Sequence, residues 1–537
     1  MKLSTRKLIA SLGAVVLVSS LAVSAVPAAN AAAPVCTTVA DVETCNGTLT
    51  NGAAYVFKMP SKFTGTMFFW EHGFRTTYPV PGVAAVPKGI EEITPANQVT
   101  GKDITKEMLK AGYAVAAYDG TVKGMRGWNN TFRVEMLKEV IDTAIAKYGT
   151  KIQRKVVYGS SQAGSIITPF VEKYPTYADS VGILAGTTPS IADSLQSACD
   201  IFYLFSVFAD PTIKGCAAFG TKGVPGHMAS VGEFAKAGAL LTAWSKNLGA
   251  PGLEYPAALK GSPIPQRSAL LLIGLLTGVP TKSANMDGVS TNAVIAEHSI
   301  NATVAVLQNI GDALATGTLA GQSISEIVGA GFYDNTKTDW AAMLDEGDAG
   351  RYNLGLSGDD GINAMLAVLK GAPRVTGNAD AIAKFKALDK SSFTSKHPTI
   401  TLSNEADRLV FAGNSARYVD RKREVYEKDL KAWKVFKKGP KPIWNTRALY
   451  AMTPETYTKF TATGLPDLTA AATAPSGVGH QTFSTKQMKA WVDMLAVAAK
   501  SGKVPTDSYV EYIATKVPYL NGDVDYRPAD LKYNFGY

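Results

Sequence analysis

The stretch Val156-Val157-Tyr158-Gly159-Ser160-Ser161-Gln162-Ala163-Gly164-Ser165 joins an expected strand to an expected helix. Gly159 and Ala163 are small residues two positions before and two after Ser161, the spacing of a nucleophile elbow. Small residues are needed there because the backbone turns sharply, and larger side chains would collide with the neighbouring strand and helix. Ser161 would then project from the helix N-terminus, with the backbone N–H of Gln162 directed at a developing oxyanion. The alternative is a simple helix cap, but the strand–turn–helix setting favours a nucleophilic serine.

Apolar runs and amphipathic stretches alternate on both sides of this motif. Strands are expected at residues 55–59, 66–70, 113–118, 155–158 and 181–184, and helices at 103–110, 131–148 and 162–174. Strands that alternate with helices predict an α/β fold with a mostly parallel central sheet and helices on both faces.

The alternation pauses between residues 187 and 395, where the sequence is rich in Ala, Gly and Leu and mostly helical in pattern. It resumes with a strand at 399–402 and a helix at 485–500. We therefore expect a core formed by residues 32–186 and 396–537, and a large, mainly helical cap or lid formed by residues 187–395. Such a cap would cover the carboxyl ends of the strands, where open α/β sheets bind their ligands.

A nucleophilic serine needs a base, and the chain has five histidines. His480 lies in a glycine-rich loop before the last expected helix, from which it can reach the elbow, and it is the predicted base. His72 follows a strand and is expected to shape the loop that supplies a second oxyanion donor, the N–H of Phe74. The remaining three, which belong to no motif and are expected to be structural, are His227, His298 and His397.

The third member of such a site is a carboxylate that orients the imidazole. Asp407 comes about five residues after the strand at 399–402 and is the predicted acid. Glu405 is the nearest rival, and Asp467 is a weaker one because no clear strand leads into it.

The order Ser161, Asp407, His480 is the order found in α/β-hydrolases. The chain resembles secreted bacterial serine α/β-hydrolases of the esterase and lipase type over roughly residues 50–185 and 395–500. The resemblance implies the α/β-hydrolase fold and ester hydrolysis through an acyl-enzyme, with no cofactor. Two departures from the family pattern are Ala163 in place of glycine and Glu71 before the His-Gly pair. The matching pieces are Gly52-Ala53-Ala54-Tyr55, Gly65-Thr66, His72-Gly73-Phe74, the elbow, Glu405-Ala406-Asp407 and Gly479-His480.

The N-terminus has the features of a secretory signal peptide. Three basic residues precede the apolar stretch 8–23, and Ala29-Asn30-Ala31 provides a small-x-small cleavage site. Cleavage after Ala31 would remove residues 1–31 and release an extracellular protein; a retained membrane anchor is the alternative. Because the best later apolar segment, Ala269–Val279, is too short to span a bilayer, no stable membrane insertion is expected.

Four cysteines remain after that cleavage: Cys36, Cys45, Cys199 and Cys216. An even number in an exported chain favours two disulfides, for which three connectivities exist. Short loops are the easiest to close, so we expect the pairs Cys36–Cys45 and Cys199–Cys216. Neither pair has metal-ligand spacing with nearby histidines, and no metal site is predicted.

Composition narrows the possible partners. The 537 residues are 46% hydrophobic and 18% charged, which excludes a disordered polymer. Lys and Arg number 54 against 45 Asp and Glu, without a concentrated basic stripe. The densest basic stretch, Arg417–Lys441, also contains acidic residues and is interpreted as a solvated helix face. No nucleic-acid partner is expected; the expected partner is a small or polymeric ester, and the oligomeric state is left open.

Two other functions fit the same residues. A secreted serine peptidase acting on short peptides would use the same machinery with carboxylates in the cap to hold the free amine, although a solvated acidic loop explains those carboxylates equally well. An inactive, hydrolase-like binding protein is disfavoured by the intact Ser/Asp/His set. The apolar stretches 270–273 and 275–276 suggest an acyl or aromatic substrate, or else core packing of the cap. The candidate carboxylates are Asp334, Asp339, Asp345, Glu346 and Asp348.

Overall fold

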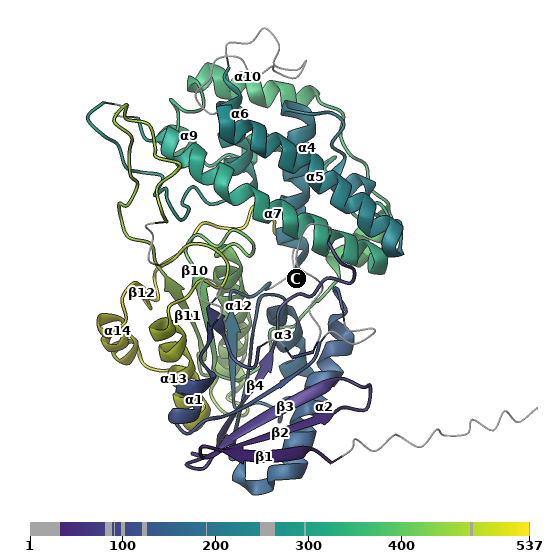
Figure 1. Ribbon diagram of the computed structural model, residues 1–537, viewed down its shortest axis with the longest axis vertical. Coiled ribbons are helices and arrows are strands. Elements are labelled where there is room, and N and C mark those ends of the chain that lie inside the picture. The colour runs from purple at the N-terminus through teal and green to yellow at the C-terminus, as the bar shows by residue number, and fades with distance from the viewer. Residues whose placement is uncertain are drawn as a thin grey trace, which may run out of the picture.

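The computed structural model shows two bodies, a sheet-containing core below and a helical cap above (Figure 1). It describes residues 33–80, 89–90, 92–97, 102–120, 126–188, 191–247, 264–294, 297–472 and 476–535. The predicted signal peptide, residues 1–31, lies outside the described residues.

Ten strands of the described chain form one sheet, in the order β1-β2-β3-β7-β4-β8-β9-β10-β11-β12. The strands from β7 to β11 run parallel, and β1, β2, β3 and β12 are antiparallel additions at the two edges. The central strands are buried on both faces because their sequences are almost continuously apolar. A separate two-stranded pair is β5 (Ala96–Asn97) with β6 (Lys102–Asp103). The sheet strands are β1 (Val35–Val39), β2 (Val42–Thr48), β3 (Ala54–Pro60), β4 (Thr66–Glu71), β7 (Ala114–Tyr118), β8 (Arg154–Ser160), β9 (Ser180–Leu184), β10 (Thr399–Asn404), β11 (Thr446–Ala451) and β12 (Leu520–Asn521).

Helices cover both faces of this sheet, as the alternating sequence pattern predicts. Apolar side chains of α2, α3 and α12 pack on one face, and those of α1, α13 and α14 pack on the other. The chain has the α/β-hydrolase fold. The core helices are α1 (Thr105–Lys110), α2 (Asn130–Tyr148), η1 (Gly149–Lys151), η2 (Ser161–Ala163), α3 (Gly164–Lys173), α12 (Gly413–Phe436), α13 (Thr485–Ser501) and α14 (Asp507–Lys516).

The chain between β9 and β10 forms the helical upper body, which has its own apolar core. Helix α6 belongs to that core, and its side chains from Leu270 to Leu276 are almost completely buried. Within the described residues, no helix combines the length and apolar character needed to cross a membrane. The cap helices are α4 (Ile191–Phe208), η3 (Gly215–Ala218), α5 (Gly223–Asn247), α6 (Gln266–Thr277), α7 (Ser299–Val328), α8 (Trp340–Met343), α9 (Glu346–Arg351), α10 (Gly358–Gly371) and α11 (Ala379–Lys386).

Two segments from the C-terminal half of the chain fasten this cap to the core. Asp287, in a cap loop, accepts hydrogen bonds from the backbone N–H groups of Tyr457 (2.7 Å) and Thr458 (2.8 Å). Near the C-terminus, Tyr533 donates to the cap residue Asp200. Figure 1 places this terminus between the two bodies, so it joins them.

The structure contains the disulfides Cys36–Cys45 and Cys199–Cys216. The first joins β1 to β2, where the two cysteines are direct register partners. This hairpin is not evident in the sequence pattern, because its polar, largely exposed strands lack a clear apolar alternation. One described group of three side chains could offer metal ligands, Cys36, Glu43 and Cys45, but its cysteines are already joined to each other.

Candidate active site

The elbow places Ser161 directly after β8, in a backbone conformation that few non-glycine residues adopt. Its φ angle is +56°, in the left-handed region, which is typical of strained functional turns. A Cβ atom on Gly159 would lie 2.3 Å from the carbonyl oxygen of Glu71 and 2.6 Å from Cβ of Ala163. The close approach of β8, β4 and the following turn therefore requires glycine at position 159 and a small residue at position 163.

The loop after β4 lies against the elbow. A Cβ atom on Gly73 would be 3.1 Å from Cβ of Ser161, so this loop and the serine are in direct contact. Within the described part of the chain, the N–H of Phe74 has no hydrogen-bond acceptor. An oxyanion donor must be free in this way, and Phe74 directly follows Gly73, the residue that lies against Ser161.

His480 and Asp407 form a buried pair. The Nδ1 atom of His480 lies 2.8 Å from Oδ2 of Asp407, and the two side chains are only 6% and 0% exposed. The other carboxylate oxygen, Oδ1, accepts hydrogen bonds of 2.9 Å from the N–H groups of Leu409 and Val410. These three hydrogen bonds fix the carboxylate, which in turn holds the imidazole ring.

The histidine and aspartate loops are joined through their backbones. Ala406 and Val478 form a parallel bridge, in which the Ala406 N–H donates to Gly477 O (2.8 Å). The Gly479 N–H donates back to Ala406 O (3.1 Å), and the Asn404 side chain donates to Gly479 O (2.7 Å). His480 therefore occupies a position set by β10, although it lies more than seventy residues away in sequence.

The two rival carboxylates have other partners. Glu405 accepts hydrogen bonds from the Lys282 ammonium (2.6 Å) and from the N–H (2.9 Å) and hydroxyl (2.8 Å) of Thr453. Asp467 accepts from the N–H and hydroxyl of Thr469 in an exposed turn. Neither carboxylate has a hydrogen bond to His480 among the described residues.

The second ring nitrogen of His480 faces an amide. Its Nε2 atom lies 3.1 Å from Nε2 of Gln481, a buried residue with φ of +58°. If that amide donates, Nδ1 must carry the ring proton toward Asp407, which is the tautomer a general base needs. In the part of the chain described, Ser161 and His480 share no hydrogen bond, so the Gln481 side chain must move before the serine can use this lone pair.

A buried arginine, which the sequence patterns did not single out, supports the elbow and the neighbouring loop. Arg133 of α2 forms an ion pair with Glu71, and Glu71 also accepts a 2.5 Å hydrogen bond from the Tyr118 hydroxyl. The same guanidinium donates to the carbonyl oxygen of His72 (2.6 Å) and to the side-chain oxygen of Gln162 (3.0 Å). Arg133 thus connects Gln162, the residue after Ser161, to the loop that carries Phe74.

Burial determines the protonation of this network. It raises the pKa of Glu71, against the opposing effect of Arg133. Burial also holds the pKa of His72 well below its usual value, and the positive charge of Arg133 lowers it further. His72 is therefore neutral and its Nδ1 is engaged with Gly73 O at 2.7 Å, which suits a structural role better than that of a base.

Arg133 had a visible sequence signal. It lies on the apolar face of α2, four positions before Leu137 and eight before Ile141. A charged residue on the buried stripe of a helix needs a buried partner. The unexpected acid before the His-Gly pair, Glu71, is that partner.

A second polar network links the elbow to the end of the cap. The Asn130 side chain donates to Ser165 Oγ (3.0 Å) in α3 and to the carboxylate of Asp389 (2.8 Å) after α11. The Trp128 indole donates to the other oxygen of that carboxylate at 2.5 Å. Burial raises the pKa of Asp389 to about 7, although both hydrogen bonds lower it.

Three of the five candidate acidic residues of the cap have local roles in the structure. Asp339 and Asp345 cap the N-termini of α8 and α9, and Asp334 accepts from the N–H groups of Thr336 and Gly377. Because these carboxylates satisfy backbone donors, they do not form an evident amine-binding site.

The three remaining histidines form no hydrogen bond with Asp407 or His480 among the described residues. His227 and His298 each bond a backbone carbonyl, of Pro79 (2.9 Å) and Arg351 (3.0 Å). Burial lowers the pKa of His397, which precedes β10.

No family model and no curated protein matches this chain. Among solved structures, feruloyl esterase B from Aspergillus oryzae is similar over 88% of this chain and 86% of its own, with 12% identity and a TM-score of 0.34. A putative lipase from Acinetobacter baumannii AYE is similar over 87% and 92%, with 11% identity and a TM-score of 0.31. The 2-hydroxy-6-oxo-6-phenylhexa-2,4-dienoate hydrolase from Rhodococcus sp. strain RHA1 is similar over 86% and 98%, with 10% identity and a TM-score of 0.30. These TM-scores are low, so the fold assignment rests on the strand order and elbow of this chain.

Proposed function

We propose that this protein is a serine hydrolase that cleaves carboxylic esters through an acyl-enzyme. The observation that carries the proposal is the buried Asp407–His480 pair at the sheet edge where Ser161 projects from a left-handed turn. These are the residue types, the chain order and the edge of the sheet that such chemistry requires.

In the proposed reaction, the Gln481 amide moves aside and His480 Nε2 takes the proton of the Ser161 hydroxyl. The serine oxygen attacks the ester carbon, and the N–H groups of Phe74 and Gln162 bind the resulting oxyanion. His480 then returns the proton to the leaving alcohol. Water, activated by the same imidazole, releases the acid and restores Ser161.

The choice of an ester over a peptide rests on the cap. An aminopeptidase needs carboxylates that hold a free amine, and three of the five candidate cap acids, Asp334, Asp339 and Asp345, are already bonded to backbone N–H groups. The apolar stripe of α6 no longer supports an acyl or aromatic substrate, because it is buried within the cap core. The acyl and alcohol groups of the ester are left open.

We further propose that the protein is exported after removal of residues 1–31. The two disulfides support this, because such bonds persist in oxidising compartments. The first residue of the secreted protein, identified by N-terminal sequencing, should be Ala32.

The decisive experiment measures kcat/KM for p-nitrophenyl esters of increasing acyl length beside a set of aminoacyl p-nitroanilides. Ester turnover with little anilide turnover is expected, and the opposite ratio would favour the peptidase. A fluorophosphonate probe should label Ser161 in the same preparation, as located by peptide mass mapping. No turnover and no labelling would favour a binding protein.

A further inference from the structure

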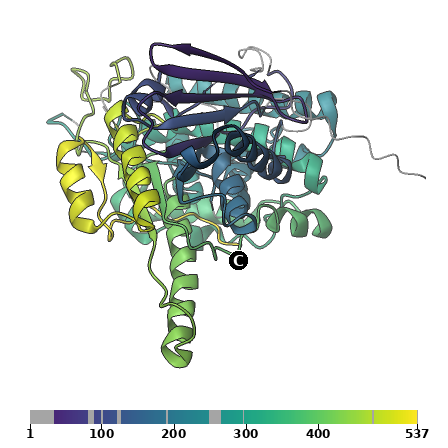
Figure 2. The ribbon, with the colours of Figure 1, turned by 90° about the horizontal axis from the view of Figure 1, so that it is seen from below.

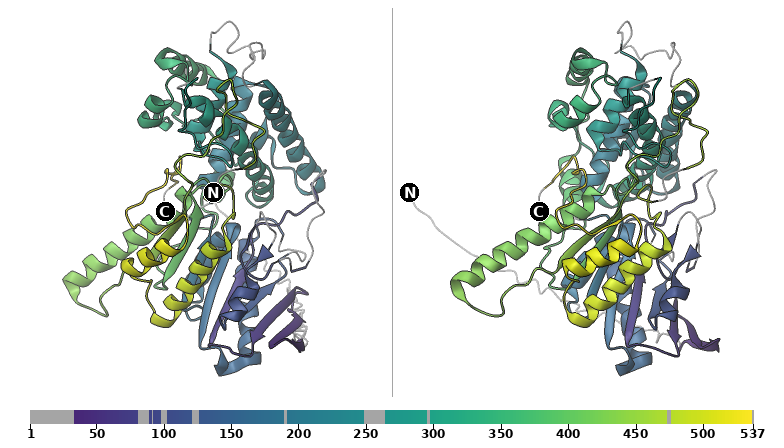
Figure 3. Two further views of the ribbon diagram at one scale, coloured as in Figure 1. Left: turned by 60° about the vertical axis from the view of Figure 1, so that its left-hand side comes forward. Right: turned by 90° about the vertical axis from the view of Figure 1, so that its left-hand side faces the viewer.

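Helix α12 extends well beyond the body of the protein. Its first turns are buried, with Tyr418 and Val419 packed in the core, whereas its last turns project freely (Figures 2 and 3). The chain then returns along the helix to β11. We call residues 428–443 the tip of this projection.

The tip combines exposed apolar and basic side chains. Val435, Phe436 and Ile443 are 68%, 74% and 59% exposed, although nothing in the core requires them there. Exposed apolar side chains gathered in this way mark interaction sites. The single acid, Asp429, pairs with Lys396 outside the tip. All six lysines are exposed: Lys428, Lys431, Lys434, Lys437, Lys438 and Lys441.

Aromatic side chains form contacts at the tip and directly beside it. The Trp433 indole donates to Gly439 O at 3.1 Å and therefore closes the turn at the end of the helix. The Lys437 ammonium lies 4.2 Å from the centre of the same ring. Tyr426 and Trp444 pack edge to face, with ring centres 5.6 Å apart.

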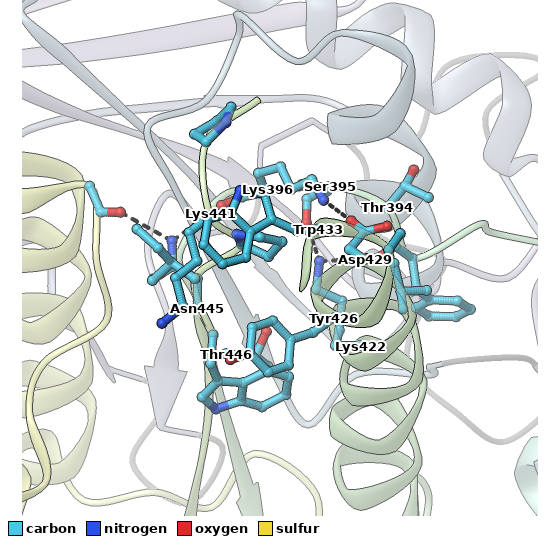
Figure 4. A pocket seen from close by; sticks show the side chains of 18 of the residues that line it. Thr394, Ser395, Lys396, Lys422, Tyr426, Asp429, Trp433, Lys441, Asn445 and Thr446 are labelled. Atoms are coloured by element: carbon cyan, nitrogen blue, oxygen red, sulfur yellow. Dashed lines mark hydrogen bonds and ion pairs between the residues drawn. The ribbon is translucent and has the colours of Figure 1, made fainter. Parts of the chain in front are cut away.

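A groove of about 620 Å³ runs along this part of the helix (Figure 4). Its walls include Trp433, Phe436, Ile443 and Trp444, together with the lysines Lys396, Lys422, Lys438 and Lys441. The groove contains none of the residues of the candidate active site. It therefore belongs to a second surface with a different role.

We propose that the tip is an anchor that adsorbs to the surface of a membrane containing anionic lipids. Exposed Val, Phe and Ile side chains at the end of a rigid projection can enter the boundary between headgroups and acyl chains, while lysines bind the negative headgroups. Tryptophan is favoured at the same depth. A soluble polyanion would use the lysines but would leave the three apolar side chains in water, so a lipid surface fits the whole tip better.

The anchor determines the orientation of the protein. The buried end of α12 contacts the strand that leads to Asp407, since Ser415 and Ser403 share a 2.6 Å hydrogen bond. A helix of 24 residues is roughly 36 Å long, so the tip lies at the far end from the candidate active site. Adsorption through the tip would therefore tether the protein without covering the site. This inference does not depend on the proposed reaction.

The test is co-sedimentation of the whole protein with vesicles of phosphatidylcholine alone or mixed with phosphatidylglycerol. Binding to the mixed vesicles is expected, with little binding to phosphatidylcholine alone. Each surface lysine contributes a factor of roughly five, so replacing Lys434, Lys437 and Lys438 with Gln should weaken binding about a hundredfold. The combined variant V435S, F436S and I443S should also lose most of the binding.

Matched controls use side chains exposed on the cap. Replacing Lys222, Lys337 and Lys370 with Gln removes the same charge, and Leu354→Ser removes an apolar side chain that is 76% exposed. Both should bind vesicles as the unaltered protein does. Thermal melting of each variant checks that it is folded.

A direct readout uses lipids with brominated acyl chains, which quench tryptophan at the membrane boundary. Quenching of the unaltered protein, and its loss in Trp433→Phe, is expected. Failure to bind mixed vesicles, or binding that neither tip variant changes, would overturn the proposal. So would equally tight binding of soluble polyphosphate that is indifferent to V435S, F436S and I443S, because that result describes a polyanion site.

Discussion

The two ends of helix α12 lie in opposite environments. At the first end, Asn414 and Ser415 are 1% exposed, and Asn414 exchanges hydrogen bonds with Ser194 of the cap. At the other end, Val435 and Phe436 are mostly exposed and have no part in the core.

This contrast separates two kinds of functional surface. Around the candidate active site, polar side chains are buried and hydrogen-bonded to one another. Substituting one of them therefore leaves its partner without a hydrogen bond in a site that water reaches poorly. At the tip, the side chains are surrounded by water, and their removal changes only what the surface can bind. Variants at the two surfaces should therefore differ in how strongly they change activity and stability.

Ser161→Ala should abolish hydrolysis of p-nitrophenyl butyrate, with kcat falling roughly 10⁶-fold, as expected when a serine nucleophile is lost. Ser160→Ala is the matched control, since its buried hydroxyl has no partner among the described side chains and backbone. The control should stay active. Activity near that of the unaltered protein in Ser161→Ala would remove this serine from the mechanism.

Asp407→Asn should lower kcat by roughly 10⁴, because the amide can hold the imidazole in the wrong tautomer. Glu405→Gln, two positions away, should have a far smaller effect, since Glu405 pairs with Lys282 and Thr453. Steady-state kinetics with both variants decide between them. A larger loss for Glu405→Gln would reverse the assignment of the acid.

Arg133→Met should lower the free energy of unfolding by about 3–5 kcal/mol, because it leaves Glu71 buried without its ion-pair partner. The double variant Arg133→Met with Glu71→Gln should recover much of that loss. Urea denaturation measures both. Lys384→Met, which breaks an exposed pair with Asp380, should change stability little. Equal losses of unfolding free energy in Arg133→Met and Lys384→Met would contradict the expected difference between buried and exposed ion pairs.

Asp200→Asn should change how stability depends on pH. Burial raises the pKa of Asp200 to about 7 in the folded protein, from a usual value near 3.8. The folded state therefore keeps a proton that the unfolded state releases, and the original protein loses stability as pH rises from about 4 to about 7.

The variant lacks this loss, so its stability relative to the original should increase by on the order of 1–3 kcal/mol across that window and then stay constant. Asn can still bond both tyrosine partners, Tyr333 and Tyr533. Unfolding midpoints measured from about pH 3 to pH 8 test this, with the lowest pH as internal control. A stability difference that does not vary with pH would contradict the assigned pKa.

Phe436→Ser at the tip should have the smallest effect on the folded protein. The free energy of unfolding should change by no more than about 0.5 kcal/mol, since the side chain is exposed. Ester hydrolysis in solution should be unchanged, while adsorption to anionic vesicles weakens. A large loss of stability would mean that the tip is packed against something in the folded protein.

The core of the fold could be predicted because its signals are local. The apolar strand 66–71, the small residues around Ser161 and the glycine-rich loop before α13 each identify their role within about ten residues. The β1–β2 hairpin was not predicted, because its polar strands carry little apolar periodicity. Helix α12 was expected only as a solvated helix face over Arg417–Lys441, without its projection from the body.

Three features can be predicted from the linear sequence: the tight turn around Ser161, the chain order of the candidate residues and the alternation that builds a parallel sheet. Steric limits at a tight turn and the burial of apolar strands constrain residues that are close together in sequence. These constraints can therefore be recognised in the sequence pattern. The contact of His480 with Asp407, rather than with Glu405 or Asp467, becomes visible in the folded structure alone. That choice depends on a backbone bridge between Ala406 and Val478, which are far apart in sequence.

The same limit applies to Arg133 and to the tip of α12. An arginine on an apolar helix face signals a missing partner, but only the packing of α2 against β4 identifies Glu71. The sequence predicts a solvated helix face for the basic stretch from Arg417 to Lys441. The folded structure adds that one end of this helix is buried in the core and that the other end projects from the body. Long-range contacts and the solvent exposure of side chains are properties of the folded protein, because both depend on which distant segments pack together and exclude water.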